Sequence, residues 1–434
     1  MEPLTIGLIG IAALMAVIFF LRVPVGFAMA LVGFSGFAMV VNPNAAVSVT
    51  ATSIWSTFTK YSLTVIPFFI LMGNICFHAG VSNRLYRAAY MWIGHIRGGL
   101  AMATVAACAG FAAICGSNAA TAATMSAVAL PEMKKYGYSS KLSTGSVASG
   151  ATLGVVIPPS VVLIIIGLST GESIAELFFA ALIPGLILTG LFMVSIWGVC
   201  KLNPELGPKG PATSWREKFR SLSGSIEMLV LFTLIMTGLY MGWFTPTEAG
   251  AAGAFFALLI AIIGRQMTLE KFKAALRDTM STSCMILVIV TGAVIFGRFL
   301  TVTRLPYETA TWAAALPIPK VAVLLLMLAI YAIGGAIMDA LGLLMITIPI
   351  FFPVALQLGY DPLWFAVLIT LVTTMGAITP PVGVNTFVVA GMAPDVPLTT
   401  VFKGVSYFLI AFALAIALVM ALPATATWLP ALLH

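Results

Sequence analysis

The sequence predicts an all-α polytopic membrane protein made of two inverted repeats, each with about five transmembrane crossings, one re-entrant helical hairpin and a broken helix. Three observations lead to this fold class: the composition, a series of long apolar segments, and residues that recur at one constant spacing. Of the 434 residues, 61% are hydrophobic and only 8% are charged, whereas soluble domains carry about 25% charged residues. One aqueous core cannot hide so much apolar surface, so the solvent must be lipid.

Long apolar segments fill nearly the whole chain and form two groups, separated by a polar linker at residues 201–220 that we place in the cytoplasm. A helix needs about 20 apolar residues to cross a bilayer. The first group comprises residues 4–20, 25–41, 61–80, 99–130, 142–168 and 177–200, and the second comprises residues 225–241, 249–264, 280–297, 321–356, 363–392 and 404–422. The remaining sequence leaves no room for a soluble domain.

Two of these segments, 99–130 and 321–356, are too long for one crossing of a ~30 Å hydrocarbon core. Small and polar residues interrupt each of them, as GSNAAT at 116–121 and as GGAIMDALG at 334–342. We therefore interpret residues 99–131 and 320–357 as re-entrant hairpins, which enter and leave the membrane on the same side.

An internal repeat links the two groups, because residues of the same type recur at a spacing of 222. The pattern T-x-G-x-x-x-P-P occurs twice, as TLGVVIPP from Thr152 and as TMGAITPP from Thr374. Further matches at this spacing are Pro24 with Pro246, Pro131 with Pro353, and Gly137-Tyr138 with Gly359-Tyr360. Each repeat has an odd number of crossings, so the second must be inverted relative to the first.

The basic residues agree with this inverted topology. With the N-terminus outside, most of the 21 Lys and Arg residues fall in loops on the cytoplasmic side, as the positive-inside rule requires. The excess over 14 Asp and Glu residues therefore reflects membrane topology, and we expect no nucleic-acid partner.

Several function classes are excluded by motifs that the sequence lacks. There is no GxxxxGK[ST] phosphate loop, so we expect no use of ATP. The five cysteines are scattered without metal-ligand spacing, and no His/Asp or Ser/Lys pair lies within the apolar segments, so we expect no enzyme. A channel would need a continuous polar path. Inverted repeats with broken helices are typical of secondary transporters.

The broken helices predict two sodium sites. A Gly/Pro break leaves backbone carbonyl and amide groups without partners, which lipid tolerates only where they line a cavity or bind a ligand. The repeated motif places such breaks within 142–168 and 363–392, and we expect each hairpin tip to face the break of its own repeat. Freed carbonyls and hydroxyls suit a small hard cation. The predicted ligands are Gly116, Ser117, Asn118, Thr152, Gly154 and Pro158 in the first site, and Gly335, Asp339, Thr374, Gly376 and Thr379 in the second.

Asp339 is the only acidic residue in the middle of a long apolar segment, and the 222-residue spacing aligns it with Ser117. An ionisable group at that depth is costly, which makes it a functional candidate. It could ligate a cation, carry a proton or stabilise the hairpin tip.

The motif regions contain no Lys or Arg, which constrains the substrate. The charge of an anion would have to be met by helix N-termini, backbone amides, hydroxyls and bound cations. The candidate substrate contacts are polar residues at the first hairpin tip and after the double prolines, namely Ser117, Asn118, Thr121, Thr124, Ser160, Asn385 and Thr386. Each could alternatively tie neighbouring helices together.

With these residues in view, the chain resembles the large membrane subunit of a tripartite ATP-independent periplasmic (TRAP) transporter, the DctM-type permease, over essentially its whole length. The resemblance rests on CGSNAATAATMSAVALPEMKKYGY (115–138), SGATLGVVIPPS (149–160), TPTEAGAAGA (245–254) and TTMGAITPPVGVNTFV (373–388). The hairpins and breaks alone would suggest only the wider ion-transporter superfamily.

The resemblance implies partners and a mechanism that the residues alone do not give. Such permeases sit in the bacterial inner membrane and work with a small four-helix membrane subunit and a periplasmic substrate-binding protein. The substrate is a C4-dicarboxylate, a keto acid, a sugar acid or sialic acid, and a sodium gradient drives uptake. The alternative is a stand-alone sodium/anion carrier of the same superfamily.

The resemblance also implies an elevator mechanism, in which one block of helices slides against a fixed scaffold. Carried onto this chain, residues 1–98 and 221–319 form the scaffold, and residues 99–200 and 320–424 form the moving block. The second hairpin departs from the GSNAAT pattern of the first, so the two cation sites differ in chemistry.

Overall fold

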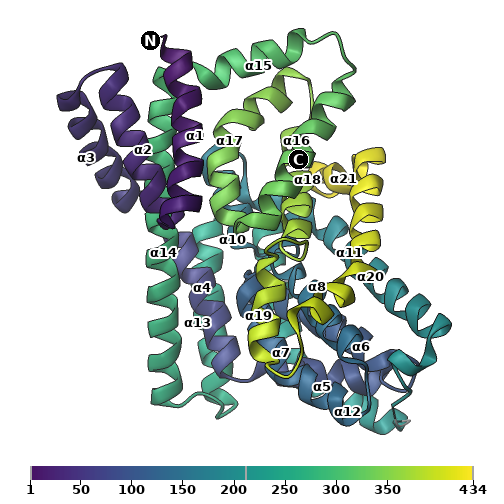
Figure 1. Cartoon of the computed structure of the whole chain (residues 1–434). Helices are drawn as coiled ribbons and strands as arrows, with labels where there is room; N and C mark the ends of the chain where they lie inside the picture. Colours follow the sequence, from purple (N-terminus) through teal and green to yellow (C-terminus); the bar gives the residue numbers. More distant parts are fainter. Residues whose placement is uncertain (1, 211–212, 433–434) are drawn as a thin grey trace.

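The computed structural model describes residues 2–210 and 213–432, and this part of the chain contains helices and no strands (Figure 1). Ten helical segments within it are long and apolar enough to cross a membrane. The predicted all-α polytopic fold class is therefore confirmed. The helices follow the apolar segments of the sequence, and breaks interrupt them where glycine and proline residues cluster.

The helices of the first repeat begin with a group that ends at the first hairpin: α1 (Pro3–Leu21), α2 (Val25–Val40), α3 (Pro43–Thr59), the 3-10 turn η1 (Tyr61–Thr64), α4 (Val65–His78) and α5 (Val81–Ile93). The second group comprises α6 (Gly99–Cys115), α7 (Asn118–Lys135), α8 (Ser140–Ala151), α9 (Leu153–Val156), α10 (Val161–Thr170) and α11 (Ile174–Leu202). A short 3-10 turn, η2 (Pro204–Leu206), follows.

The second repeat has the same order of helices: α12 (Trp215–Tyr240), α13 (Pro246–Ile263), α14 (Leu269–Val302), α15 (Leu305–Ala315), α16 (Lys320–Ile337), α17 (Ala340–Gln357), α18 (Pro362–Gly376), α19 (Val384–Met392), α20 (Leu398–Ala421) and α21 (Ala424–Ala431). A shift of 222 residues brings α2 onto α13, α5 onto α15, and the helix pairs α6–α7 onto α16–α17, each within a few residues. Both hairpins and both breaks thus lie at equivalent positions.

Helix α3 is the main element that the apolar segments did not predict. Its sequence, PNAAVSVTATSIWSTFT, is too rich in Ser and Thr to look like a membrane helix. Within the helix these hydroxyls are satisfied locally, because Thr52 Oγ1 donates to the Ser48 carbonyl at 2.9 Å and Thr57 Oγ1 donates to the Ser53 carbonyl at 2.8 Å. Together α3 and α4 correspond to the single helix α14 of the second repeat.

The linker between the repeats is narrower than residues 201–220. Helix α11 continues through Leu202, and α12 already begins at Trp215. Ser214 and Glu217 start α12 with a reciprocal capping box, in which each side chain accepts from the other residue's backbone N–H.

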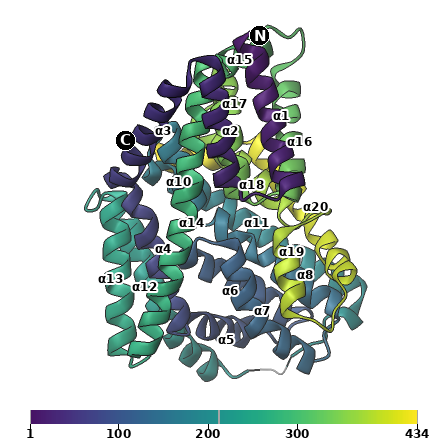
Figure 2. The same cartoon turned by 60° about the vertical axis from the view of Figure 1, so that its left-hand side comes forward.

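The structure groups its helices into two parts (Figure 2). In the first, α2 and α4 of one repeat pack against α14 and α13 of the other. In the second, α8 packs against α20, and α11 packs against both α18 and α20. Figure 2 shows α12, α13 and α14 on one side and α8, α19 and α20 on the other. Each part is therefore assembled from both repeats.

Glycines allow the closest crossing in the first part, between α2 and α14. A Cβ on Gly292 would lie 2.0 Å from the Gly26 carbonyl oxygen, and a Cβ on Gly33 would lie 2.8 Å from Phe296 backbone atoms. Helices in lipid associate through packing of small residues, since apolar burial does not distinguish a neighbouring helix from a lipid tail. The α2–α14 contact therefore depends on these glycines.

We predict that Gly292→Ala lowers the midpoint of thermal unfolding in detergent, because the new methyl group would overpack the contact with α2 at a cost of about 1–3 kcal/mol. Gly297→Ala on the same helix is the matched control, since a Cβ there meets nothing within 4 Å. The control should be neutral, or stabilised by up to about 1 kcal/mol through helix propensity. Equal midpoints for the two variants would contradict this account of the crossing.

Candidate functional site

The first hairpin tip lies directly against the break in the α8–α10 segment. A Cβ on Gly154 would lie 2.7 Å from the Ser117 carbonyl oxygen and 2.9 Å from Thr121 Oγ1. Gly116 adopts a left-handed conformation (φ +62°), and a Cβ there would lie 2.9 Å from the Pro159 carbonyl oxygen. The expected meeting of tip and break therefore occurs, and it brings together Gly116, Ser117 and Gly154 of the predicted first site.

The second hairpin tip makes the equivalent contact with the break between α18 and α19. A Cβ on Gly376 would lie 2.4 Å from the Gly335 carbonyl carbon, and a Cβ on Gly335 would lie 2.5 Å from the Thr373 carbonyl oxygen. The Ala336 carbonyl accepts hydrogen bonds from the backbone N–H groups of Val382 and Gly383, at 3.1 and 3.2 Å. This places Gly335 and Gly376 of the predicted second site side by side.

Both breaks have the same backbone design. The peptide bonds Pro158–Pro159 and Pro380–Pro381 are both cis. Prolines cannot donate a backbone hydrogen bond, so the helices cannot continue through these positions. Helix α10 restarts after Ser160, whose Oγ accepts from the Leu163 N–H at 3.4 Å.

Hydroxyl groups of the repeated motif donate their protons within their own helices. Thr152 donates to the Ser149 carbonyl and Thr374 to the Thr370 carbonyl, while Thr379 donates to the Met375 carbonyl at 2.8 Å. A hydroxyl that donates its proton keeps lone pairs on its oxygen. The oxygens of the predicted Thr ligands can therefore still coordinate a cation through these lone pairs.

Four buried side-chain oxygens near the breaks have no hydrogen-bond partner within the described residues: Asn118 Oδ1, Ser149 Oγ, Thr373 Oγ1 and Asn385 Oδ1. Such groups are costly to bury without a partner. Two of them belong to each repeat, and oxygen is the ligand atom that a hard cation prefers. The donor set fits two sodium ions better than a transition metal, because no cluster of His, Cys, Asp and Glu occurs in the described part of the chain.

Ser117 and Asp339 occupy equivalent positions as the N-caps of α7 and α17. Ser117 Oγ accepts from the Ala120 N–H at 3.5 Å, and Asp339 Oδ2 accepts from the Leu341 N–H at 3.0 Å. The structure thus shows Asp339 stabilising the hairpin tip, which is one of the three roles open from the sequence. One carboxylate oxygen engaged in this cap leaves the other oxygen for a ligand.

The candidate substrate contacts are distributed over both repeats. Thr121 and Thr124 lie buried on α7, and Asn385 and Thr386 lie fully buried at the start of α19. Helix α19 packs against α7 and α8, and Asn385 Nδ2 donates to the Ala148 carbonyl at 3.5 Å. The contacts predicted from the two repeats therefore meet inside one part of the structure.

Comparison with known proteins agrees with this geometry. Residues 12–425 match the family described as "Tripartite ATP-independent periplasmic transporter, DctM component". The C4-dicarboxylate TRAP transporter large permease protein DctM of Pseudomonas aeruginosa is 34% identical over 381 residues, which are 88% of either chain. The chain belongs to the TRAP transporter large permease family.

Other relatives of this large permease differ in the substrate that their names give. The sialic acid TRAP transporter large permease protein SiaM of Vibrio cholerae is 30% identical over 414 residues, covering 95% of this chain and 96% of SiaM. The 2,3-diketo-L-gulonate protein YiaN of Escherichia coli is 33% identical over 337 residues, covering 77% of this chain and 78% of YiaN. The solved YdaH transporter of Alcanivorax borkumensis has a TM-score of 0.66 over 89% of this chain and 90% of its own, at 16% identity, and therefore supports the fold alone.

Sequence reasoning missed two of the four unpartnered oxygens of this TRAP large permease. Ser149 and Thr373 flank the repeated motif, but a shift of 222 residues pairs them with Leu371 and Ala151. A search for matched residue types could not find them. Their signal is a hydroxyl within a turn of the motif, in SGATLG and in TTMG.

A cavity of about 630 Å³ lies between helices of the two parts of this TRAP large permease. One wall consists of residues from α3, η1 and α14, including Lys60 and Val290, and the other consists of residues from α10 and α17, including Thr170 and Phe352. Elsewhere the two parts touch, since α4 packs against α6 and α14 packs against α17, so the cavity interrupts their interface locally.

Proposed function

We propose that the chain is the permease subunit of a sodium-coupled, binding-protein-dependent secondary transporter that imports small organic anions. The observation that carries the proposal is the duplicated contact of a hairpin tip with a broken helix, with two unpartnered buried oxygens in each repeat. Sodium bound at these oxygens would satisfy them and would also supply positive charge where the motif regions hold no Lys or Arg.

An anionic substrate is consistent with the relatives. The names of three of them specify a C4-dicarboxylate, sialic acid or 2,3-diketo-L-gulonate. The identities of 30–34% leave the particular anion open. We therefore assign a small organic anion bound between the start of α7 and the start of α19, where hydroxyl and amide groups of the two repeats meet.

We further propose an elevator mechanism with the block 99–200 and 320–424 moving against the scaffold 1–98 and 221–319. The cavity between the two parts supports this division, since a continuous packed interface would resist sliding. Contacts between repeats within the block also support it, because Asn385 and Ala148 hold its halves together. The small membrane subunit would dock on the scaffold and the periplasmic binding protein would deliver the anion, in the inner membrane of a bacterium.

We predict that Thr373→Val and Ser149→Ala each reduce stabilisation by sodium. Each change removes an oxygen that has no hydrogen-bond partner, so the sodium-free protein should stay as stable or gain stability. The measurement is the rise of the thermal midpoint with NaCl, compared with choline chloride. Each variant should require about tenfold more sodium, equivalent to about 1.4 kcal/mol.

The matched controls for these variants are Thr370→Val on α18 and Ser146→Ala on α8. Both residues are buried, and both hydroxyls donate to carbonyls of their own helix, at 2.7 and 2.9 Å. The controls should keep the wild-type sodium dependence. Loss of sodium stabilisation in the controls but not in Thr373→Val and Ser149→Ala would contradict the site.

We predict that Asp339→Asn weakens the sodium response while preserving the hairpin tip. Asn caps a helix about as well as Asp, so the bond to the Leu341 N–H is retained and only the charge is lost. Sodium-dependent uptake and the unfolding midpoint without sodium are measured together. A lower midpoint with an unchanged sodium response would show that Asp339 acts only as a cap.

We predict that proteoliposomes holding this chain and its small subunit accumulate the anion only with an inward sodium gradient and the binding protein present. Each component is omitted in turn, and a potassium gradient serves as the control. Uptake by this chain alone would favour the stand-alone carrier. Uptake without any sodium gradient would refute sodium coupling.

A further inference from the structure

A second cavity, of about 510 Å³, lies between α5 and α12. Its lining comprises three arginines, one glutamate, one methionine, two serines and one glycine: Arg84, Arg87, Met91, Glu217, Arg220, Ser221, Ser223 and Gly224. The arginines come from two different helices and two different repeats. Neither the proposed ion sites nor the substrate path uses these residues.

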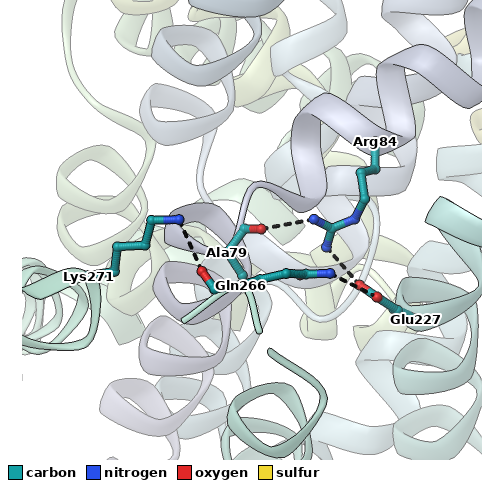
Figure 3. Close-up of polar contacts among 5 residues, drawn as sticks. All are labelled: Ala79, Arg84, Glu227, Gln266 and Lys271. Carbon is teal, nitrogen blue, oxygen red and sulfur yellow. Dashed lines mark hydrogen bonds and ion pairs between the residues drawn. The ribbon is translucent and has the colours of Figure 1, made fainter. Parts of the chain in front are cut away.

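One wall of this cavity is fixed in place by the contacts of Arg84 (Figure 3). Its guanidinium donates to Glu227 Oε2 at 2.7 Å and to the Ala79 carbonyl at 2.9 Å, and Gln266 Nε2 donates to Glu227 Oε1 at 3.2 Å. Gly224 brings α12 close, because a Cβ there would lie 3.2 Å from Arg84 Cβ. These contacts fix the position of the Arg84 side chain at the wall of the cavity.

The other two arginines form no ion pair in the described part of the chain, and with one carboxylate, Glu217, against three arginines the lining keeps a net positive charge. Arg87 and Arg220 are exposed, and neither guanidinium has an ion-pair or hydrogen-bond partner among the described residues. The carboxylate of Glu217 accepts from the Ser214 N–H and hydroxyl, both at 2.9 Å, in the capping box. The hydroxyls of Ser221 and Ser223 donate to backbone carbonyls at 2.7 Å. Two free guanidinium groups therefore face one cavity and can hold an anion.

The aromatic and basic residues around the cavity indicate that it lies at the level of lipid headgroups. Trp92 lies 5.8 Å from Phe219 and 6.4 Å from Trp215 between ring centroids, and Trp92 Nε1 donates to the Lys218 carbonyl at 3.2 Å. Trp215 and Phe219 are 68% and 62% exposed. Clusters of Trp with basic residues are typical of the membrane–water interface. The short amphipathic helix α5 also suits this level.

We propose that this cavity, the α5–α12 pocket, binds the phosphate headgroup of an anionic phospholipid of the cytoplasmic leaflet, with Arg87 and Arg220 as the recognition groups. The topology predicted from the positive-inside rule places α5 and the start of α12 at the cytoplasmic face, and basic pockets between membrane helices on that side suit anionic headgroups. Met91 and the exposed rings of Trp215 and Phe219 give the acyl chains an apolar surface, which a free phosphate would not need. The bound lipid would tie the first repeat's α5 to the second repeat's α12.

The test is a titration of the purified full-length chain, in neutral detergent, with dioleoylphosphatidylglycerol. We expect the thermal midpoint to rise with this lipid and not with dioleoylphosphatidylcholine. The double variant R87Q/R220Q should need roughly tenfold or more lipid for the same rise, since it removes both basic groups that attract the anionic headgroup. R97Q/R216Q carries the same change in net charge at exposed positions outside the pocket and should behave as wild type.

Two results would overturn the proposal. Equal lipid dependence of R87Q/R220Q and R97Q/R216Q would show attraction by net charge alone. Stabilisation by inorganic phosphate to the same extent as by phosphatidylglycerol would assign the pocket to a free anion. Met91→Glu, which places a negative charge in the pocket without removing an arginine, should reproduce the loss. R87K/R220K should retain most of the binding, and its failure to do so would contradict a headgroup held by charge.

Discussion

Every backbone N–H or C=O group that loses its helical hydrogen-bond partner at a break must find another partner inside the protein, because lipid offers none. This constraint explains why tips and breaks meet. The Ala336 carbonyl, at the end of α16, accepts two N–H groups freed by the double proline of the second repeat. Glycines at Gly154 and Gly376 let backbone approach backbone where a Cβ would collide. Near the breaks, the side-chain oxygens of Ser149, Thr373 and the two Asn residues remain without a hydrogen-bond partner in the described part of the chain. A cation can use these oxygens as ligands.

The fold was largely predictable because lipid makes hydropathy and the positions of glycine and proline informative. The two over-long, interrupted segments located both hairpins and the 222-residue spacing located both breaks, and the structure places most helices of the two repeats at matching positions. Helix α3 was not predicted, because its Ser and Thr hydroxyls lower its hydropathy. In the folded helix, hydroxyls of this kind donate hydrogen bonds to carbonyls one turn away. The sequence shows that such hydroxyls are present, but only the folded helix shows where they donate.

The site was predictable at the motif and, among the four unpartnered oxygens, only for those of Asn118 and Asn385. Matched positions revealed Thr152, Gly154, Thr374 and Gly376, because both repeats must break their helices in the same way. Ser149 and Thr373 both precede the motif, but by three residues and by one residue respectively, and so break the symmetry. A second such difference is that Asp339 in the second repeat occupies the position equivalent to Ser117 in the first. The backbone design of a break is shared between repeats, whereas the side chains that complete each site are set separately.

The same separation between shared backbone and individual side chains applies to the short helices beside the hairpins. Helix α15 corresponds to α5, yet a shift of 222 residues replaces Arg84 and Arg87 by Pro306 and Thr309. In the predicted inverted topology these two helices lie at opposite membrane faces, and only the cytoplasmic face favours basic residues. A fold with internal symmetry can therefore carry an anion pocket on one face alone, because the membrane that surrounds it has two unlike faces.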